Sequence, residues 1–262
     1  MSHPYLRGAR TPRVLAHRGF VAPDAAAQGT VDNSFAAFAA AHALGVEYVE
    51  SDCHLTRDGV VVLFHDDDLS RVASDPRPVA GVSEHELAEI MAERGGLVTL
   101  AQALDAFPDV RWNLDVKAPD AAAAVGRLVA PHAHRVLLTS FSDDRRLEAL
   151  AAAQRAGAAV RPATSPGSAT MARLLAGLLL RRRRAVAALL DDVDALQIPE
   201  RQRGLPVLSA RLLDAAHRAG VEVHVWTVND ADDMRRLLAM GVDGLVTDRA
   251  DLALRAAGDI AP

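Results

Sequence analysis

Short apolar runs typical of buried strands alternate along the whole chain with longer runs that have the apolar period of a helix. Eight strand-like runs occur, at residues 14–16, 47–52, 111–116, 135–139, 158–161, 195–198, 222–226 and 243–246. Most of them are apolar almost throughout, as expected for parallel strands that are covered on both faces. Helical patterns lie between them, at residues 34–44, 121–130, 144–156, 171–190 with a break, 210–219, 231–240 and 249–256.

This alternation predicts an α/β fold, a single-domain (β/α)8 barrel of the TIM type, over residues 1–262. The turn at Asp58-Gly59 predicts an additional hairpin after the second strand, followed by two short helices that begin at Glu84 and Leu100. No linker rich in proline, glycine or serine divides the chain. A barrel of this kind typically needs about 250 residues, so one domain accounts for the length.

Composition and charge narrow the class of protein. The residues are 50% hydrophobic and 24% charged, which is ordinary for a folded domain and excludes a disordered chain. The formal net charge of -5 offers no basic surface to a polyanion, so we expect no nucleic-acid partner. The single cysteine, Cys53, cannot form an internal disulfide, and the first residues contain no apolar stretch of signal-peptide length. These features predict a cytoplasmic protein; no apolar stripe identifies an oligomer interface.

The segment from Leu174 to Leu190 is unusually apolar but has four consecutive arginines, residues 181–184, in its middle. Such a block of charge excludes a membrane-spanning helix. Two interpretations remain. The segment is either a solvated junction between two short helices that cover the barrel, or a surface that touches anionic lipid.

Polar and charged residues gather at the carboxyl ends of the predicted strands, the end of an α/β barrel where catalytic groups lie. The residues at this end are His17, Arg18, Glu50, Asp52, His65, Asp115, Lys117, Arg161, Trp226 and Asp248. Lys117 is the only lysine among 29 lysine and arginine residues. A chain that uses arginine almost everywhere has kept a compact amine at one place, which indicates a specific role.

Glu50 and Asp52 are two residues apart on one predicted strand, so their side chains share a face. Inside a barrel the two carboxylates would repel each other unless a cation binds between them. Asp115, near the end of another strand, supplies a third carboxylate, and such an all-oxygen set suits Mg²⁺ or Ca²⁺. The alternative is a buried ion network in which Arg18 and Lys117 neutralise the carboxylates without a metal ion.

His17 and His65 also fall at this end, and two imidazoles can serve as general base and general acid near neutral pH. Arg18, next to His17, can bind phosphate oxygens through two N–H groups. Two imidazoles, an arginine and a metal ion predict a centre that cleaves a phosphodiester. The residues leave open which histidine is the acid and whether water or a neighbouring hydroxyl group attacks phosphorus.

Several of these residues belong to longer motifs. The motifs are Ala16-His17-Arg18-Gly19, Asp32-Asn33-Ser34, Glu50-Ser51-Asp52, Phe64-His65-Asp66, Asn113-Leu114-Asp115-Val116-Lys117, Trp226-Thr227-Val228-Asn229 and Val246-Thr247-Asp248. In this order, and across essentially the whole chain, they resemble the glycerophosphodiester phosphodiesterase family.

The resemblance implies a role for each predicted site residue. His17 and His65 match the acid/base pair, Arg18 and Lys117 match phosphate-binding residues, Trp226 matches an aromatic residue that lines the pocket, and Glu50, Asp52 and Asp115 match the metal ligands. The implied cofactor is Mg²⁺ or Ca²⁺. The implied reaction is metal-dependent hydrolysis of small-molecule glycerophosphodiesters to sn-glycerol 3-phosphate and an alcohol.

The chain departs from the family at two carboxylates, since the family usually has glutamate where Asp32 and Asp115 stand. Each change shortens the side chain by one methylene. A barrel that binds phosphodiesters without turning them over is therefore one alternative function. A lysophospholipase D-type phosphodiesterase acting at a membrane surface is another, which the segment from Leu174 to Leu190 would suit.

Overall fold

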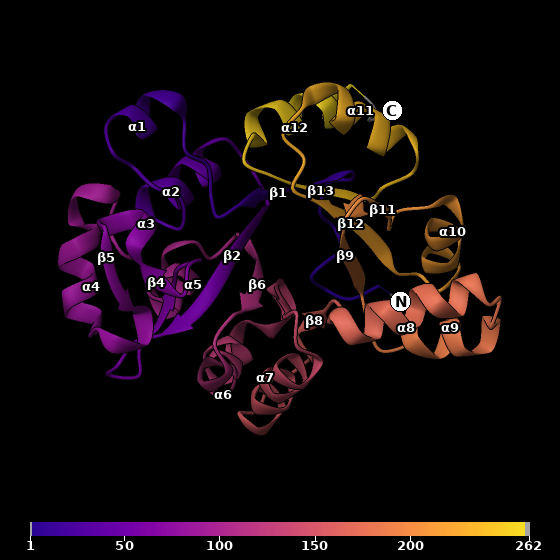
Figure 1. The fold of residues 1–262 in the computed structure, drawn as a ribbon, viewed down its shortest axis with the longest axis horizontal. Coiled ribbons are helices and arrows are strands. Elements are labelled where there is room, and N and C mark those ends of the chain that lie inside the picture. The colour runs from indigo at the N-terminus through magenta and orange to yellow at the C-terminus, as the bar shows by residue number, and fades with distance from the viewer. Residues whose placement is uncertain (1, 260–262) are drawn as a thin grey trace.

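The computed structural model describes residues 2–259, and at its centre eight parallel strands form a nearly closed barrel (Figure 1). The strands are β1 (Arg13–His17), β2 (Tyr48–Leu55), β6 (Arg111–Val116), β7 (Val136–Thr139), β8 (Ala163–Thr164), β9 (Ala195–Pro199), β12 (Glu222–Trp226) and β13 (Gly244–Thr247). They follow the order β8-β7-β6-β2-β1-β13-β12-β9. Between β8 and β9 the Asp194 amide donates to the Thr164 carbonyl at 2.9 Å. The predicted barrel is confirmed.

Helices surround the strands on all sides (Figure 1). They are α2 (Phe35–Ala43), α5 (Leu100–Ala106), α6 (Ala122–Val129), α7 (Asp143–Arg155), α8 (Ser168–Leu179), α9 (Arg183–Leu190), α10 (Ala210–Arg218), α11 (Ala231–Ala239) and α12 (Ala250–Gly258). Polar side chains start several of them: Ser34, Ser142, Ser209 and Asp230 accept backbone N–H bonds from the first turns of α2, α7, α10 and α11. These caps explain why the predicted helix starts lie within a few residues of the observed ones.

The longest segment inserted between two strands of the barrel follows β2. Strand β3 (Val61–Leu63) pairs antiparallel with β2, which confirms the predicted hairpin, and α4 (Glu84–Met91) and α5 begin where predicted. Four short elements beside the barrel mouth were not predicted: α1 (Pro23–Ala27), β4 (Asp68–Leu69), α3 (Ser70–Ala73) and β5 (Asp75–Pro78). A further small hairpin, β10 (Arg201–Gln202) with β11 (Leu205–Pro206), follows β9. Each is too short to produce a hydrophobic period.

The predicted fifth strand, residues 158–161, is wrong. The structure places β8 at Ala163–Thr164 instead. The residues after α7 still belong to its cap, because the Ala158 amide reaches back to the Ala153 carbonyl around Gly157, whose φ is +86°. Arg161, expected at the carboxyl end of a strand, pairs with Asp194 at 2.8 Å just before β9 begins. It therefore lies at the amino-terminal end of the barrel, away from the site.

The predicted break between residues 171 and 190 is confirmed. Helices α8 and α9 lie side by side and are joined at residues 180–182, where Arg181 has a φ of +55° (Figure 1). The four arginines 181–184 are all exposed. Within residues 2–259, no helix combines the length and the apolarity needed to cross a bilayer.

The amino-terminal end of the barrel is plugged by a cluster that includes Tyr5 and Tyr48 from the segment before β1 and the start of β2. The Tyr48 hydroxyl donates to the Tyr5 carbonyl at 3.0 Å. Beside them, Arg13 donates to both oxygens of Glu222, at 2.9 and 3.2 Å, and His224 lies 3.1 Å from the same carboxylate. Because this end is filled, the open end of the barrel is the one that carries the predicted site.

The Arg13–Glu222 pair should make a large contribution to stability. Burial alone would raise the pKa of Glu222, but the hydrogen bonds from His224 and Arg13 outweigh it and lower the pKa to about 2. The stabilisation is therefore complete above the ordinary pKa of 4.5 and is lost as the pH falls from there toward 2. Glu222→Gln should cost roughly 3 to 5 kcal/mol in urea unfolding at pH 7, because Arg13 stays buried without a counter-charge. Glu89→Gln, at an exposed helix position, is the control; equal stability of the two variants would refute this role of Glu222.

Candidate active site

A cavity of about 440 Å³ opens at the carboxyl ends of the strands. All eight residues predicted for the site line it: His17, Arg18, Glu50, Asp52, His65, Asp115, Lys117 and Trp226. A pocket of this size is typical of small-molecule sites at the mouth of α/β barrels. The structure thus brings the predicted residues together, whereas Arg161 is not among them.

Strand register explains why these residues meet. The pairing of β1 with β2 sets His17 opposite Glu50, and the pairing of β2 with β6 sets Asp52 opposite Asp115. Glu50 and Asp52 have the same orientation on β2, and both are almost fully buried. Three carboxylates from two adjacent strands therefore face one cavity.

Two cations neutralise most of this negative charge. The Lys117 Nζ atom lies 2.8 Å from Asp115 Oδ2 and 3.1 Å from Asp52 Oδ1, and Arg18 Nε lies 3.3 Å from Asp52 Oδ2. Burial, and then repulsion from Asp52, raise the pKa of Glu50 well above its usual range. Burial also raises the pKa of Asp115, even though the charge of Lys117 opposes it. The carboxylates outweigh burial at Lys117 and raise its pKa. Three carboxylates next to two cations leave one formal negative charge in excess when all three carboxylates are ionised.

The side chains of this cluster are of the type that binds a divalent cation, but they are not arranged around one position in advance. Across residues 2–259, no three histidine, cysteine or acidic side chains are already arranged to hold a metal ion. At the predicted metal ligands, the ammonium of Lys117 lies between Asp52 and Asp115. The donors are all hard oxygens, the three carboxylates outnumber the two cations beside them, and Asp115 Oδ1 is buried without a hydrogen bond from any described residue. These features suit Mg²⁺ or Ca²⁺.

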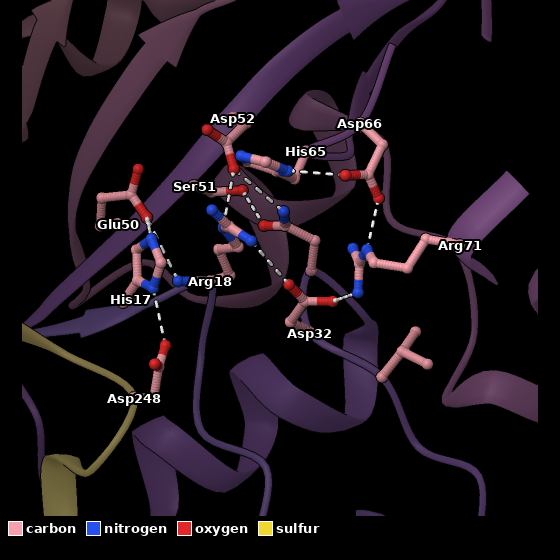
Figure 2. A network of polar contacts seen from close by, with 12 residues as sticks. His17, Arg18, Asp32, Glu50, Ser51, Asp52, His65, Asp66, Arg71 and Asp248 are labelled. Atoms are coloured by element: carbon pink, nitrogen blue, oxygen red, sulfur yellow. Dashed lines mark hydrogen bonds and ion pairs between the residues drawn. The ribbon is translucent and has the colours of Figure 1, made fainter. Parts of the chain in front are cut away.

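Each of the two histidines has one ring nitrogen fixed by a carboxylate (Figure 2). His17 Nδ1 lies 2.7 Å from Asp248 Oδ1, and His65 Nδ1 lies 2.9 Å from Asp66 Oδ1. The hydrogen bond with His17 lowers the pKa of Asp248. A carboxylate at Nδ1 selects the tautomer whose Nε2 is free to accept a proton. Asp66 and Asp248 stand in the motifs noted above, but no role could be given to them before their distances to the histidines were known.

A chain of ion pairs joins the two histidine segments (Figure 2). Arg71, on the short helix α3, donates to Asp66 Oδ2 at 2.5 Å and to Asp32 Oδ1 at 2.9 Å. Asp32 in turn accepts from Arg18 at 3.1 Å. Sequence reasoning missed Arg71, because α3 is too short to be recognised and no motif includes it. The shorter Asp32 side chain, where glutamate is usual, still reaches Arg18.

Buried polar groups hold the β2 carboxylates in place. The Asn33 amide donates to Asp52 Oδ2 at 3.2 Å and accepts from the Ser51 hydroxyl at 2.6 Å. Asn33 has a φ of +55°, a conformation that asparagine tolerates better than most residues. His54 lies 3.3 Å from the His65 carbonyl and so contacts the segment that carries His65. Two residues of the Asp32-Asn33-Ser34 motif therefore contact the site: Asp32 accepts from Arg18, and Asn33 donates to Asp52.

Comparison with known proteins gives consistent results. A model of the glycerophosphoryl diester phosphodiesterase family matches residues 17–252. The protein named "Probable glycerophosphodiester phosphodiesterase 2" of Mycobacterium tuberculosis is 36% identical over 241 residues, which cover 91% of this chain and 88% of that protein.

Two solved structures share the fold. A glycerophosphodiester phosphodiesterase from Thermotoga maritima superposes with a TM-score of 0.67 at 23% identity, covering 92% of this chain and 96% of that one. An Oleispira antarctica phosphodiesterase in complex with the product sn-glycerol-3-phosphate gives a TM-score of 0.67 at 21% identity, covering 94% of this chain and 96% of that one. At these identities the two structures establish the barrel fold.

Proposed function

The chain belongs to the glycerophosphoryl diester phosphodiesterase family, and we propose that it hydrolyses glycerophosphodiesters to sn-glycerol 3-phosphate and an alcohol. One observation carries the proposal: two imidazoles, each oriented by a carboxylate, line the same cavity as Arg18 and Lys117. That is the set of groups a phosphodiester needs for binding and for two proton transfers.

Arg18 and Lys117 would hold the phosphate. The phosphodiester is a monoanion, and the guanidinium and ammonium groups both reach the cavity from beside the buried carboxylates. Fixed positive charge at this point also stabilises the additional charge that develops on the phosphate oxygens in the transition state. Trp226 and Phe141 pack edge to face, with centroids 6.1 Å apart, at the cavity wall.

His17 and His65 would move the protons. One imidazole accepts a proton from the attacking hydroxyl as the new P–O bond forms, and the other donates a proton to the departing alcohol oxygen as its P–O bond breaks. The same two groups serve whether water attacks directly or the adjacent glycerol hydroxyl attacks first and water then opens the cyclic phosphate.

Glu50, Asp52 and Asp115 would hold a divalent cation, Mg²⁺ or Ca²⁺. Such an ion, when bound, supplies a positive charge that polarises the phosphate. With such an ion held by the carboxylates, the ammonium of Lys117 would be free to pair with the substrate phosphate. The short side chain of Asp115 is compatible with this role because its buried Oδ1 atom has no other partner within the described residues.

Removing the carboxylate that orients His17 tests the acid/base arrangement. Asp248→Asn should lower kcat by about 10- to 100-fold, less than for a fully buried triad aspartate, because the side chain of Asp248 is 54% exposed. Asp192→Asn, at an exposed position before β9, is the matched control. An unchanged kcat would rule out the positioning role.

Peripheral contact with anionic membrane through the segment from Leu174 to Leu190 is part of the proposal. Leu179 and Leu180 are 76% and 59% exposed, and the arginines 181–184 that follow them are exposed as well. The protein should co-sediment with phosphatidylglycerol vesicles at low salt, and replacing all four arginines by glutamine should weaken binding by as much as about 10³-fold. Neutral phosphatidylcholine vesicles are the control. Equal binding to both vesicle types, or to neither, would contradict a charge-driven contact.

The substrate class is tested by measuring sn-glycerol 3-phosphate released from glycerophosphocholine, glycerophosphoethanolamine and glycerophosphoglycerol, each with Mg²⁺, Ca²⁺ or Mn²⁺. Turnover of at least one of these diesters is expected. No release from any of them would contradict the proposed function. The cytoplasmic location and the exclusion of nucleic acid stay predictions.

A further inference from the structure

One guanidinium, that of Arg71, bridges two carboxylates that each contact a residue of the cavity (Figure 2). Its Nε donates to Asp66 Oδ2 at 2.5 Å, and its Nη1 donates to Asp32 Oδ1 at 2.9 Å. The other oxygen of Asp66, Oδ1, lies 2.9 Å from His65 Nδ1. The other oxygen of Asp32, Oδ2, accepts from Arg18 at 3.1 Å. Each carboxylate therefore has one oxygen on Arg71 and one on a residue that lines the cavity.

Arg71 itself does not line the cavity, and its side chain is 47% exposed. It can therefore act on a bound diester only through its two partners. Burial raises the pKa of Asp66, but the hydrogen bonds from His65 and Arg71 outweigh it and lower the pKa, so Asp66 is a carboxylate near neutral pH. A carboxylate that is held at both oxygens has little freedom to rotate, and its contact with the imidazole then has a fixed direction.

The backbone that carries Arg71 is held on both sides. Leu69, two residues earlier, is fully buried in the small apolar core of the segment between β2 and β6. One residue after Arg71, the Val72 carbonyl accepts from Arg94 Nε at 2.8 Å. The half-exposed side chain of Arg71 fills no core position, and ion pairs at such positions add little to the free energy of unfolding. Its removal should therefore leave the fold intact.

We propose that Arg71 is a positioning residue, which fixes the imidazole of His65 relative to the guanidinium of Arg18. This inference rests on the proposed function, in which Arg18 holds the phosphate and His65 exchanges a proton with one of its ester oxygens. A displacement of about 1 Å between such groups can lower the rate by about 10²-fold. Loss of Arg71 should therefore lower kcat although Arg71 touches neither the substrate nor the reacting atoms.

Replacement of the side chain, followed by chemical rescue, tests the proposal. Arg71→Ala should lower kcat for glycerophosphocholine hydrolysis by about 10- to 100-fold. Added guanidinium ion should restore part of the loss, because the place of the side chain is open to solvent and the ion has the same planar set of N–H groups. Methylammonium, which has the charge but not the planar shape, should restore less. A variant that has only lost stability would not gain activity from guanidinium, which weakens folded structure.

Arg77→Ala is the matched control. Arg77 lies in the same segment, is 49% exposed and pairs with Asp75 and Glu86, neither of which lines the cavity. This variant should keep the wild-type kcat and should not respond to guanidinium. Arg71→Gln is a second variant, should Arg71→Ala misfold.

A double variant shows whether Arg71 acts through Asp66. Asp66→Asn should lower kcat by a factor similar to that of Arg71→Ala, and the loss in the double variant should fall well short of the product of the two losses. A wild-type kcat in Arg71→Ala, no rescue by guanidinium, an equal loss in Arg77→Ala, or losses that multiply would overturn the inference alone. No hydrolysis by the wild-type protein overturns the proposed function, and this inference with it.

Discussion

Alanine in place of His17 or of His65 should lower kcat for glycerophosphocholine hydrolysis by about 10²- to 10⁴-fold in each case. Each imidazole lines the cavity and has its Nδ1 fixed by an aspartate, so each is poised to exchange a proton through Nε2. Loss of either leaves one of the two proton transfers without a partner. The free energy of unfolding should change little, because both side chains lie at an open cavity and fill no core position.

The pH profiles of the two variants should differ. A bell-shaped profile reports one group that must be deprotonated and one that must be protonated, so each variant should lose a different limb. The variant that loses the acidic limb identifies the base. His85→Ala is the matched control, since that histidine is 83% exposed on α4. Wild-type rates in His17→Ala or in His65→Ala would refute the acid/base assignment.

Removal of divalent ions should lower turnover about as much as loss of one of the two histidines. Treatment with EDTA should reduce turnover by about 10³-fold or more, and Mg²⁺ or Ca²⁺ should restore it. The physical reason is the excess negative charge at Glu50, Asp52 and Asp115, which Arg18 and Lys117 leave only partly neutralised. Asp115→Asn should raise the ion concentration needed for half-maximal activity.

Full activity in EDTA would mean that the ion network of Arg18 and Lys117 suffices on its own. Lys117→Met separates this outcome from metal dependence. If Lys117 binds phosphate beside a metal ion, the variant should raise KM and keep its need for Mg²⁺ or Ca²⁺. If Lys117 replaces the metal ion, the variant should lose activity whatever ion is added.

The barrel could be predicted from the sequence because its strands are nearly continuous apolar runs separated by well-capped helices. The one wrong strand shows the limit of that signal. Residues 158–160 are apolar, but they complete the cap of α7, and the actual strand β8 has only two residues. A strand that short leaves no period in the sequence, and its place is set by neighbouring strands.

The members of the site could be predicted for a similar reason, since parallel strands bring their carboxyl ends to one place. The hydrogen-bond and ion-pair partners of these residues could not be predicted. That the Lys117 ammonium lies between Asp52 and Asp115 depends on a side-chain conformation, and that Arg71 joins Asp32 to Asp66 depends on a four-residue helix.

Hydrolysis of glycerophosphocholine in ¹⁸O-labelled water, followed by ³¹P NMR and mass spectrometry of both products, shows whether the enzyme cleaves the diester by attack of water at phosphorus. We expect sn-glycerol 3-phosphate with one ¹⁸O atom on phosphorus and choline with none, because water attacks phosphorus on either route and the P–O bond to choline breaks. Labelled choline, or a diester that stays intact with Mg²⁺ or Ca²⁺ present, would contradict it.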